Sequence, residues 1–379
     1  MTLAQQSKLS GPAQLIPPLL SLPPIAARVV AWQREHGRHG LPWQGTRDPY
    51  RVWLSEVMLQ QTQVATVLDY YARFLARFPD VASLAAAPQE DVLALWSGLG
   101  YYSRARNLHR CAQAVMVQHG GQFPRSSAEL VALPGIGRST AAAIAAFCFG
   151  ERAAILDGNV KRVLARALGF GGDLALAAQE RLLWLKAEAL LPQQQVDVYT
   201  QGLMDLGATV CLVRRPACAA CPLVADCVGH ALGAPERFPV KTRKLRRTGR
   251  SNALLWLQQG PLIWLVQRPQ QGVWAGLWSL PEYDSPQLLD ALVAAWPGRG
   301  QWLPAFKHVL THVDWTLQVL RWQRPPGAAE SQTGLGRWVT VAEALAMGLP
   351  APVRKLLDAE LSAELSNYDL FIAQETVDQ

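Results

Sequence analysis

The sequence predicts two domains of different classes, an all-α domain followed by a smaller α+β domain. Over about the first two hundred residues, apolar side chains recur at helical spacing without a convincing two-residue alternation. From about residue 250, short alternating runs stand between glycine and proline turns, a pattern typical of strands. Four clustered cysteines and a basic stretch separate these regions. A chain of 379 residues is long enough for two such domains.

The expected domain boundaries follow these changes in composition. Prolines interrupt any possible signal-peptide core near the N-terminus, so residues 1–24 predict a disordered tail. The all-α domain is expected at 25–228, a basic linker at 229–250, the α+β domain at 251–365 and an acidic tail at 366–379.

Periodicity places the individual elements within these domains. Helices of the first domain are expected at 25–35, 52–74, 88–96, 103–118, 179–191 and 199–206. In the second domain, strands are expected at 253–258, 262–267, 307–310 and 315–322, and helices at 287–296 and 341–347.

Composition and charge narrow the class of protein. Half of the residues are hydrophobic and 17% are charged, which predicts a globular protein with a sizeable core. The net charge of +7 favours an anionic partner, nucleic acid first and a membrane surface second. No run of about 18 apolar residues occurs, so no membrane span is expected. Six cysteines, four of them clustered, do not suit a secreted disulfide framework and indicate a cytoplasmic protein.

The middle of the chain carries a glycine turn followed by a carboxylate. The turn Leu133–Gly137 reads Leu-Pro-Gly-Ile-Gly and precedes an alanine-rich helix. A helix N-terminus behind such a turn attracts phosphate through exposed amides and the helix dipole. Asp157 follows about twenty residues later, between an apolar run and a helix start. This order suits chemistry on a sugar attached to the bound phosphate. The alternative is an ordinary αα-hairpin with an N-cap aspartate.

A second carboxylate, Glu56, lies in the helix expected at 52–74. It stands beside Trp53 and Val57, on the same side as Gln60 and Gln63. Desolvation by apolar neighbours favours the protonated form of a carboxyl group, which suits a general acid. The alternative is an ordinary solvated helix residue.

The clustered cysteines predict a metal centre. Cys211, Cys218, Cys221 and Cys227 have C-x6-C-x2-C-x5-C spacing. Zinc sites usually pair two C-x2-C knuckles a dozen or more residues apart, whereas this loop contains one such pair. Four thiolates on one short loop suit a [4Fe–4S] cluster, and zinc is the alternative. The other two cysteines, Cys111 and Cys148, are expected to be buried thiols in helices.

Taken together, the motifs resemble the adenine DNA glycosylases of the MutY type, which belong to the helix–hairpin–helix glycosylase superfamily. The matching segments are WLSEVMLQQT (53–62), GLGYY (98–102), LPGIG (133–137), DGN (157–159) and the cysteine loop. The resemblance covers residues 25 to 228 strongly and 250 to 350 more weakly. It implies an all-α glycosylase domain with a [4Fe–4S] loop, followed by a MutT-like, Nudix-fold domain that reads the lesion. It also implies a monomer whose partner is double-stranded DNA.

The resemblance implies removal of adenine mispaired with 8-oxoguanine or guanine. Glu56 would protonate the flipped base, and Asp157, kept ionised by helix-start amides, would stabilise the cationic sugar with support from Asn159. Gln61 and Tyr101 would wedge into the duplex. The remaining implied contacts are Asp205 at the adenine, Gly135, Gly137 and Ser139 at the hairpin, and Thr311 and His312 on the lesion-reading loop.

Departures from related patterns limit the expected chemistry. Bifunctional endonuclease-III-like relatives carry a lysine nucleophile where this chain has Ser139, so we expect a monofunctional glycosylase with weak lyase activity at most. Lys161 stands nearby as electrostatic support or as a slow, incidental Schiff-base former. The R-E-x-x-E-E metal helix of Nudix pyrophosphatases is absent from the sequence between Ser285 and Trp302, so the second domain should read DNA. Leu310 replaces the aromatic residue that usually precedes the lesion-reading hydroxyl.

Three rival functions remain open at this point. A bifunctional pyrimidine glycosylase/lyase is disfavoured by Ser139 and by the appended domain. A non-catalytic iron–sulfur protein that recognises mispairs would leave Glu56 and Asp157 as ordinary helix residues. A redox electron carrier is disfavoured because nothing in the sequence suggests a flavin or nicotinamide site.

Overall fold

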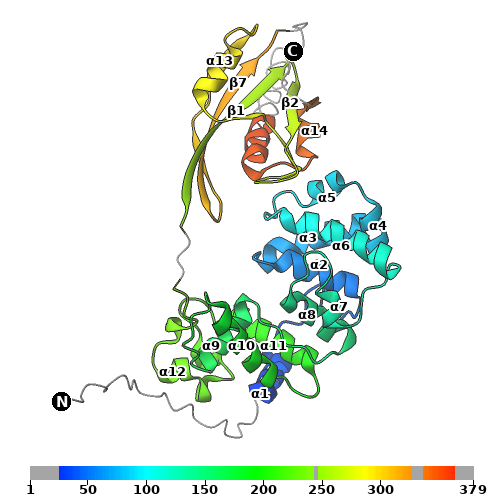
Figure 1. The fold of residues 1–379 in the computed structure, drawn as a ribbon, viewed down its shortest axis with the longest axis vertical. Helices are drawn as coiled ribbons and strands as arrows, with labels where there is room; N and C mark the ends of the chain where they lie inside the picture. Colours follow the sequence, from blue (N-terminus) through cyan, green and yellow to red (C-terminus); the bar gives the residue numbers. More distant parts are fainter. Residues whose placement is uncertain (1–24, 243–245, 326–335, 363–379) are drawn as a thin grey trace, which may run out of the picture. The chain divides into compact units, whose positions relative to one another are not determined.

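The computed structural model describes residues 25–242, 246–325 and 336–362 (Figure 1). The chain forms two compact units, of which the first comprises Met1–Arg38 and Arg152–Val240 and the second comprises His39–Glu151 and Lys241–Gln379. The helical region expected at 25–228 therefore contributes to both units. The tails expected at 1–24 and 366–379 lie outside the described residues. None of the described helices is long and apolar enough to cross a membrane.

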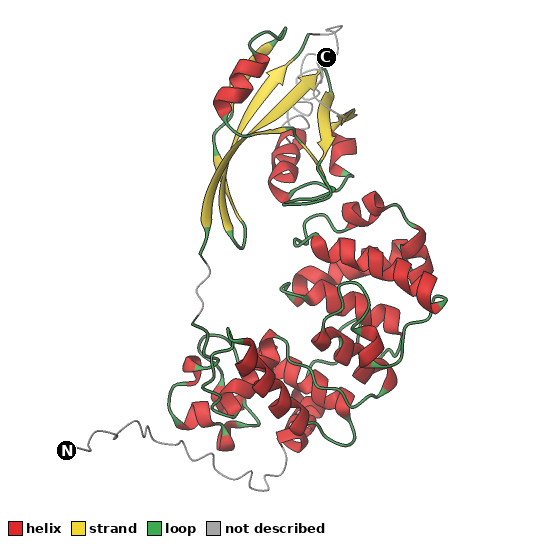
Figure 2. Cartoon of the chain, viewed as in Figure 1, coloured by secondary structure: helices red, strands yellow, loops and turns green. Residues whose placement is uncertain are grey.

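The first unit is built from helices in its described part (Figure 2). They are α1 (Ile25–His36), α9 (Gly158–Ala167), α10 (Ala177–Ala189), α11 (Val196–Thr209) and α12 (Val228–Ala231), with the 3-10 helices η1 (Cys218–Ala220), η2 (Val224–Asp226) and η3 (Pro235–Arg237). α11 packs against α1 and α9. A Cβ at Gly207 would lie only 2.6 Å from the Cβ of Asn159, so glycine permits the close approach of α11 to α9. This packing fixes the end of α9 that follows Asp157.

The second unit begins with seven helices in its described part. They are α2 (Pro49–Leu59), α3 (Val64–Arg77), α4 (Val81–Ala86), α5 (Gln89–Leu95), α6 (Ser103–His119), α7 (Ser127–Leu130) and α8 (Arg138–Phe149). The single helix expected at 52–74 is wrong, because α2 ends at Leu59 and α3 begins at Val64. Gln61, between them, has a left-handed φ of 59°, which an α-helix cannot contain.

The same unit also contains a mixed sheet. Its strands are β1 (Thr248–Gln259), β2 (Leu262–Gln267), β3 (Trp278–Ser279), β4 (Glu282–Tyr283), β5 (Arg299–Trp302), β6 (Phe306–Val309), β7 (Val313–Gln323) and β8 (Gly336–Thr340). The main order is β3-β2-β1-β7-β5, and β4, β6 and β8 pair with β1, β7 and β2. β1 and β7 run parallel with Leu254 opposite Val319, and the other pairs are antiparallel.

Helices accompany the sheet at α13 (Pro286–Val293), at α14 (Val341–Leu345) and over residues 351–362. α13 lies against the sheet beside β1 (Figure 1), where Leu289 and Val293 pack with Leu255 and its neighbours. Leu254 and Trp256 point to the other side and belong to a separate core cluster. The predicted fold class, helices followed by an α+β domain, is confirmed.

The segment expected to be a linker at 229–250 is more ordered than predicted. It contains most of α12, all of η3 and the first residues of β1, which begins at Thr248. Residues 243–245 of this segment lie outside the described residues. Structured elements therefore lie on both sides of the basic residues. Charge and proline content alone predicted a longer linker than the structure contains.

Candidate active site

Glu56 lies on α2, in a turn that is otherwise buried. Trp53 is fully buried, Val57 is buried, and Glu56 itself is partly buried. α2 packs against α8. Burial raises the pKa of Cys148 on α8 to about 12, with smaller contributions from the charges of Asp48 and Glu56. The structure thus gives Glu56 the apolar neighbours that the sequence predicts.

Asp157 is the N-cap residue of α9. Its Oδ1 accepts a hydrogen bond from the backbone N–H of Val160 at 2.7 Å. Burial nevertheless raises the pKa of Asp157; the amides of Val160 and Asn159 and the charges of Arg162 and Lys161 oppose this rise without cancelling it. The helix-start amides expected from the sequence are present, but desolvation is the larger effect. The carboxylate therefore combines hydrogen-bond donors with incomplete hydration.

Asn159 is held by an arginine that the sequence reasoning did not single out. Its Oδ1 accepts from Nη2 of Arg162 at 2.9 Å. The same guanidinium donates to the carbonyls of Gly207 and Cys211, both at 2.7 Å. Arg162 thereby joins the start of α9 to the end of α11 and to the cysteine loop. No sequence signal marks this role, because the partners are backbone carbonyls 45 and 49 residues away.

Asp205, on α11, is fully buried. Its Oδ1 accepts from Nε of Arg38 at 2.7 Å and from Nε2 of Gln201 at 2.9 Å, and its Oδ2 accepts from the backbone N–H of Arg38 at 3.0 Å. Both carboxylate oxygens are thus used inside the first unit. A direct contact between Asp205 and adenine stays a prediction, and the role that the structure describes for Asp205 is to hold Arg38.

The glycine turn joins α7 to α8 as a hairpin. Gly135 has φ of 76°, and a Cβ there would lie 2.5 Å from the Cβ of Asn107, so this position requires glycine. Gly137 is the N-cap of α8 and is exposed, as is Gly135, whereas Ser139 is partly buried. The turn presents backbone amides at the N-terminus of a twelve-residue helix, a geometry that suits a phosphate group.

Gln61 and Tyr101 share an unusual backbone conformation. Their φ angles are 59° and 48°, in the left-handed region that residues with a Cβ rarely occupy. Both side chains are exposed, and Tyr101 has 46% of its surface accessible. Each stands at the tip of a short connection, between α2 and α3 or between α5 and α6. The structure therefore places both predicted wedge residues on the surface of the second unit.

The four clustered cysteines surround one cavity in the first unit. All four line it, together with apolar side chains that include Val163, Ala167 and Leu223. Arg166, which is 2% exposed, braces the loop: its guanidinium donates to the carbonyls of Leu212 and Val213 at 2.6 and 2.9 Å. Among residues 25–242, 246–325 and 336–362, no three His, Cys, Asp or Glu side chains form a group that could hold a metal ion.

The predicted lesion-reading residues lie on the turn between β6 and β7. Thr311 and His312 are both exposed. The turn is closed by a hydrogen bond from the N–H of Leu310 to the carbonyl of Val313 at 2.8 Å. The carbonyl of His312 accepts from the N–H of Thr248 at 3.0 Å, which ties the turn to the start of β1. Fixed backbone and exposed side chains suit a contact surface.

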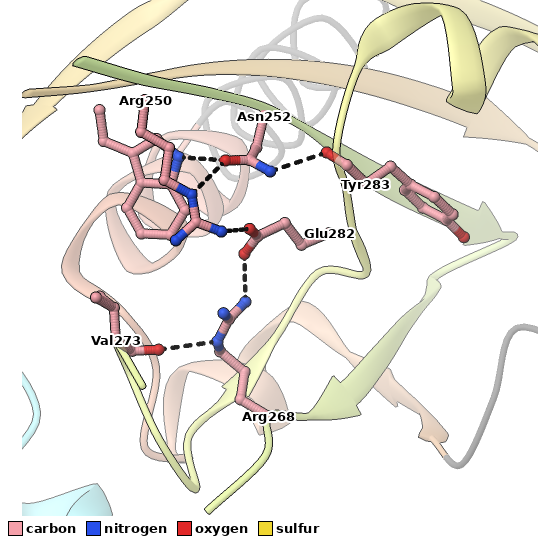
Figure 3. Close-up of polar contacts among 7 residues, drawn as sticks. Arg250, Asn252, Arg268, Val273, Glu282 and Tyr283 are labelled. Carbon is pink, nitrogen blue, oxygen red and sulfur yellow. Dashed lines mark hydrogen bonds and ion pairs between the residues drawn. The ribbon is translucent and has the colours of Figure 1, made fainter. Parts of the chain in front are cut away.

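A polar cluster supports the neighbouring glycine- and tryptophan-rich loop at 272–278 (Figure 3). The carboxylate of Glu282 lies between the guanidinium groups of Arg250 and Arg268 and accepts hydrogen bonds from both. Arg250 also donates to Oδ1 of Asn252 at 2.7 Å, and Arg268 donates to the carbonyl of Val273 at 3.2 Å. Glu282 thereby forms ion pairs with two arginines of the same domain. Through Arg268 it holds the loop at Val273.

Known families match both parts of the chain. Residues 54–186 match the model of the HhH-GPD superfamily of base excision DNA repair proteins, and residues 252–359 match the NUDIX domain. A helical hairpin region followed by a Nudix-like sheet therefore defines the chain as a base excision DNA repair protein.

Similar proteins narrow the family further. Over 339 residues the chain is 34% identical to the adenine DNA glycosylase of Buchnera aphidicola (subsp. Baizongia pistaciae), covering 87% of this chain and 94% of that one. It is 33% identical to the adenine DNA glycosylase of Mus musculus (88% and 77% covered) and 34% identical to that of Homo sapiens (83% and 70% covered). The chain belongs to the adenine DNA glycosylase family, which confirms the resemblance seen in the sequence.

Proposed function

We propose that the protein removes adenine from duplex DNA where adenine is paired with 8-oxoguanine or guanine. The observation that carries the proposal is a pair of carboxylates in unlike surroundings. Glu56 lies among buried apolar residues of α2, and Asp157 accepts an amide hydrogen bond at the start of α9. A general acid and an anionic stabiliser need such different environments. Membership of the adenine DNA glycosylase family supports adenine as the base removed.

The proposed reaction begins when adenine leaves the base stack, because the glycosidic bond cannot be attacked inside the duplex. Glu56 then protonates N7 of the base. The C1′–N9 bond breaks, its electron pair goes to the base, and an oxocarbenium-like sugar remains. Asp157 offsets this positive charge or captures it transiently, with Asn159 in support. Water finally attacks C1′ and gives its proton to the Glu56 carboxylate, which leaves an abasic site, free adenine and the regenerated acid.

The absence of a lysine at position 139 supports a monofunctional enzyme, because a Schiff base with the sugar needs an amine. Lys161, on the helix that follows Asp157, is already engaged: its Nζ lies 2.5 Å from Oε1 of Glu180. Strand cleavage by β-elimination therefore has no dedicated nucleophile among the residues assigned here.

A strand-break assay tests the proposed reaction. We expect duplexes with adenine opposite 8-oxoguanine or guanine to break only after alkali, and only in the adenine strand. Duplexes with oxidised pyrimidines should stay intact. Breaks that form without alkali would contradict the monofunctional proposal, and intact adenine strands would contradict the proposed function itself.

We also propose that Cys211, Cys218, Cys221 and Cys227 hold a [4Fe–4S] cluster. Four thiols that line one cavity and come from one short loop suit a [4Fe–4S] cluster, whereas zinc sites usually pair two C-x2-C knuckles. When bound, the cluster would cross-link residues 211–227 and so fix the loop that carries Arg214 and Arg215, two cations suited to a phosphate backbone.

Metal analysis tests the cluster. Purified protein should contain about four iron atoms per chain and show the visible absorption of an iron–sulfur centre. Cys221→Ser should lose most of this iron, whereas Cys111→Ala, at a buried cysteine of α6, should keep it. One zinc atom per chain in place of iron, or full iron content in Cys221→Ser, would contradict the assignment.

A further inference from the structure

Arg104, in the first turn of α6, is buried and surrounded by backbone carbonyls. It is 8% exposed. Its Nη1 lies within hydrogen-bond distance of the carbonyls of Val57, Met58 and Gln60, at 3.0, 2.8 and 2.8 Å. Its Nη2 reaches Oγ1 of Thr62 at 3.1 Å and the carbonyls of Leu99 and Gly100, both at 3.2 Å. One side chain therefore joins the end of α2 to the loop before α6.

Two of these carbonyls precede the exposed residues with left-handed backbone. The Gln60 carbonyl belongs to the peptide that leads into Gln61, and the Gly100 carbonyl belongs to the peptide that leads into Tyr101. Binding both oxygens fixes the orientation of both peptide planes. These peptides come from connections 40 residues apart in sequence (101 minus 61), and Arg104 supplies the contact that they share.

The shape of the arginine side chain matters for this arrangement. A planar guanidinium offers several donors in a fixed fork, whereas lysine offers one compact ammonium group. The group also lies over the rings of Trp96 and Tyr101, at 5.3 and 5.4 Å from the ring centroids. Burial lowers the pKa of Arg104 to about 10, which still leaves it charged at neutral pH. The charge is thus available for both the carbonyls and the aromatic faces.

We propose that Arg104 is a positioning residue that holds Gln61 and Tyr101 in their left-handed conformations, so that both side chains meet the duplex ready to enter the base stack. This role rests on the proposed function, in which these two residues act as wedges. Left-handed backbone at residues with a Cβ is unfavourable and persists only where the surroundings impose it. Without the guanidinium, the α2–α3 and α5–α6 connections would relax independently. Gln61 and Tyr101 would then no longer be held in a fixed position relative to each other.

The test compares Arg104→Met and Arg104→Lys in the full-length protein with its metal centre. Base unstacking is followed by the fluorescence of 2-aminopurine placed next to the target adenine, and excision by single-turnover kinetics. We expect Arg104→Met to reduce the extrusion signal strongly and to slow excision on the order of 10²-fold, as small misplacements do. Arg104→Lys should recover part of the signal, because it keeps the charge but not the fork.

A mutant cycle separates positioning from general destabilisation. If Arg104 acts through Gln61 and Tyr101, then adding Arg104→Met to a protein that already carries Gln61→Ala and Tyr101→Ala should reduce extrusion and excision little further. Arg152→Met is the control, because it removes another guanidinium that binds carbonyls, those of Leu191 and Pro192 at the end of α10. It should leave the extrusion signal unchanged. Melting temperatures identify any variant that fails to fold, and Arg104→Lys then carries the test.

Two outcomes would contradict the inference. Wild-type extrusion in both folded Arg104 variants would overturn it, and so would independent, multiplicative effects in the cycle. Adenine release by wild-type protein, measured first, separates this result from the proposed function. If wild type releases no adenine, the proposed function fails. If wild type releases adenine while the Arg104 variants match it, only the positioning role fails.

Discussion

Replacing Glu56 by glutamine is expected to slow adenine excision by a factor of about 10²–10⁴, the usual contribution of a positioned general acid. Glutamine has nearly the same size and a good helix propensity, so α2 should remain intact. Its amide can accept or donate a hydrogen bond but cannot deliver a proton to N7. Single-turnover excision should therefore fall steeply, while binding to the mispaired duplex, measured by fluorescence anisotropy, should change little.

The matched control for this change is Glu35→Gln on α1, where the same substitution falls on a side chain that is 78% exposed. It should leave excision unchanged. A duplex carrying 7-deazaadenine, which has carbon in place of N7, should resist the wild-type protein for the same reason that Glu56→Gln fails. Normal excision by Glu56→Gln, or normal release of 7-deazaadenine, would mean that N7 protonation is not the activating step.

The sequence predicted best those helices and strands whose formation depends on neighbouring residues within the same segment. β2 was predicted with its observed bounds, because the apolar run 262–267 lies between turns that contain Gly260 and Gly272. β3 and β4 are two residues long, and β5 is mostly exposed, so none of them presents an alternation to read. The break at Gln61 is different, because its surroundings include Arg104, more than 40 residues later. Tertiary contacts of this kind override local periodicity.

In the candidate site, too, features marked by local sequence could be predicted and features that depend on distant contacts could not. Glu56, Asp157 and the cysteines could be predicted as candidates because their proposed chemistry demands particular residue types in recognisable settings. Arg38 and Arg162 were missed, since their partners are a buried carboxylate and distant carbonyls that no spacing announces. The raised pKa of Asp157 was missed as well, because desolvation sums over every group that packs around a carboxylate. Sequence suggested the groups that we propose to react, and the structure supplied what surrounds them.

Replacing Asp157 by asparagine is expected to slow excision on the order of 10²–10³-fold, by removing the charge that faces the sugar cation. The same change should leave the folded protein at least as stable as wild type at neutral pH. Asparagine is as good an N-cap as aspartate, so the hydrogen bond from the N–H of Val160 can be kept. Burial meanwhile disfavours the charge of Asp157, and asparagine carries none.

The raised pKa of Asp157 determines how stability and activity should change with pH. Because the pKa of Asp157 is raised in the folded state, the native protein binds this proton more readily than the unfolded chain does. Its contribution to stability therefore falls as pH rises from the unfolded pKa of about 3.9 through the folded pKa. Excision needs the ionised form, so wild-type activity should fall as pH drops through the same window. Activity and stability should move in opposite directions.

Thermal unfolding at several pH values tests the argument. The melting temperature of Asp157→Asn should match or exceed that of wild type at pH 7, and this difference should shrink towards pH 4. Asp80→Asn, at the N-cap of α4, is the control with the opposite sign, because hydrogen bonds from Ser83 lower the pKa of Asp80. That variant should gain nothing at neutral pH. An Asp157→Asn protein that is less stable than wild type at pH 7 but fully active would show that this carboxylate is structural and that the sugar cation is stabilised elsewhere.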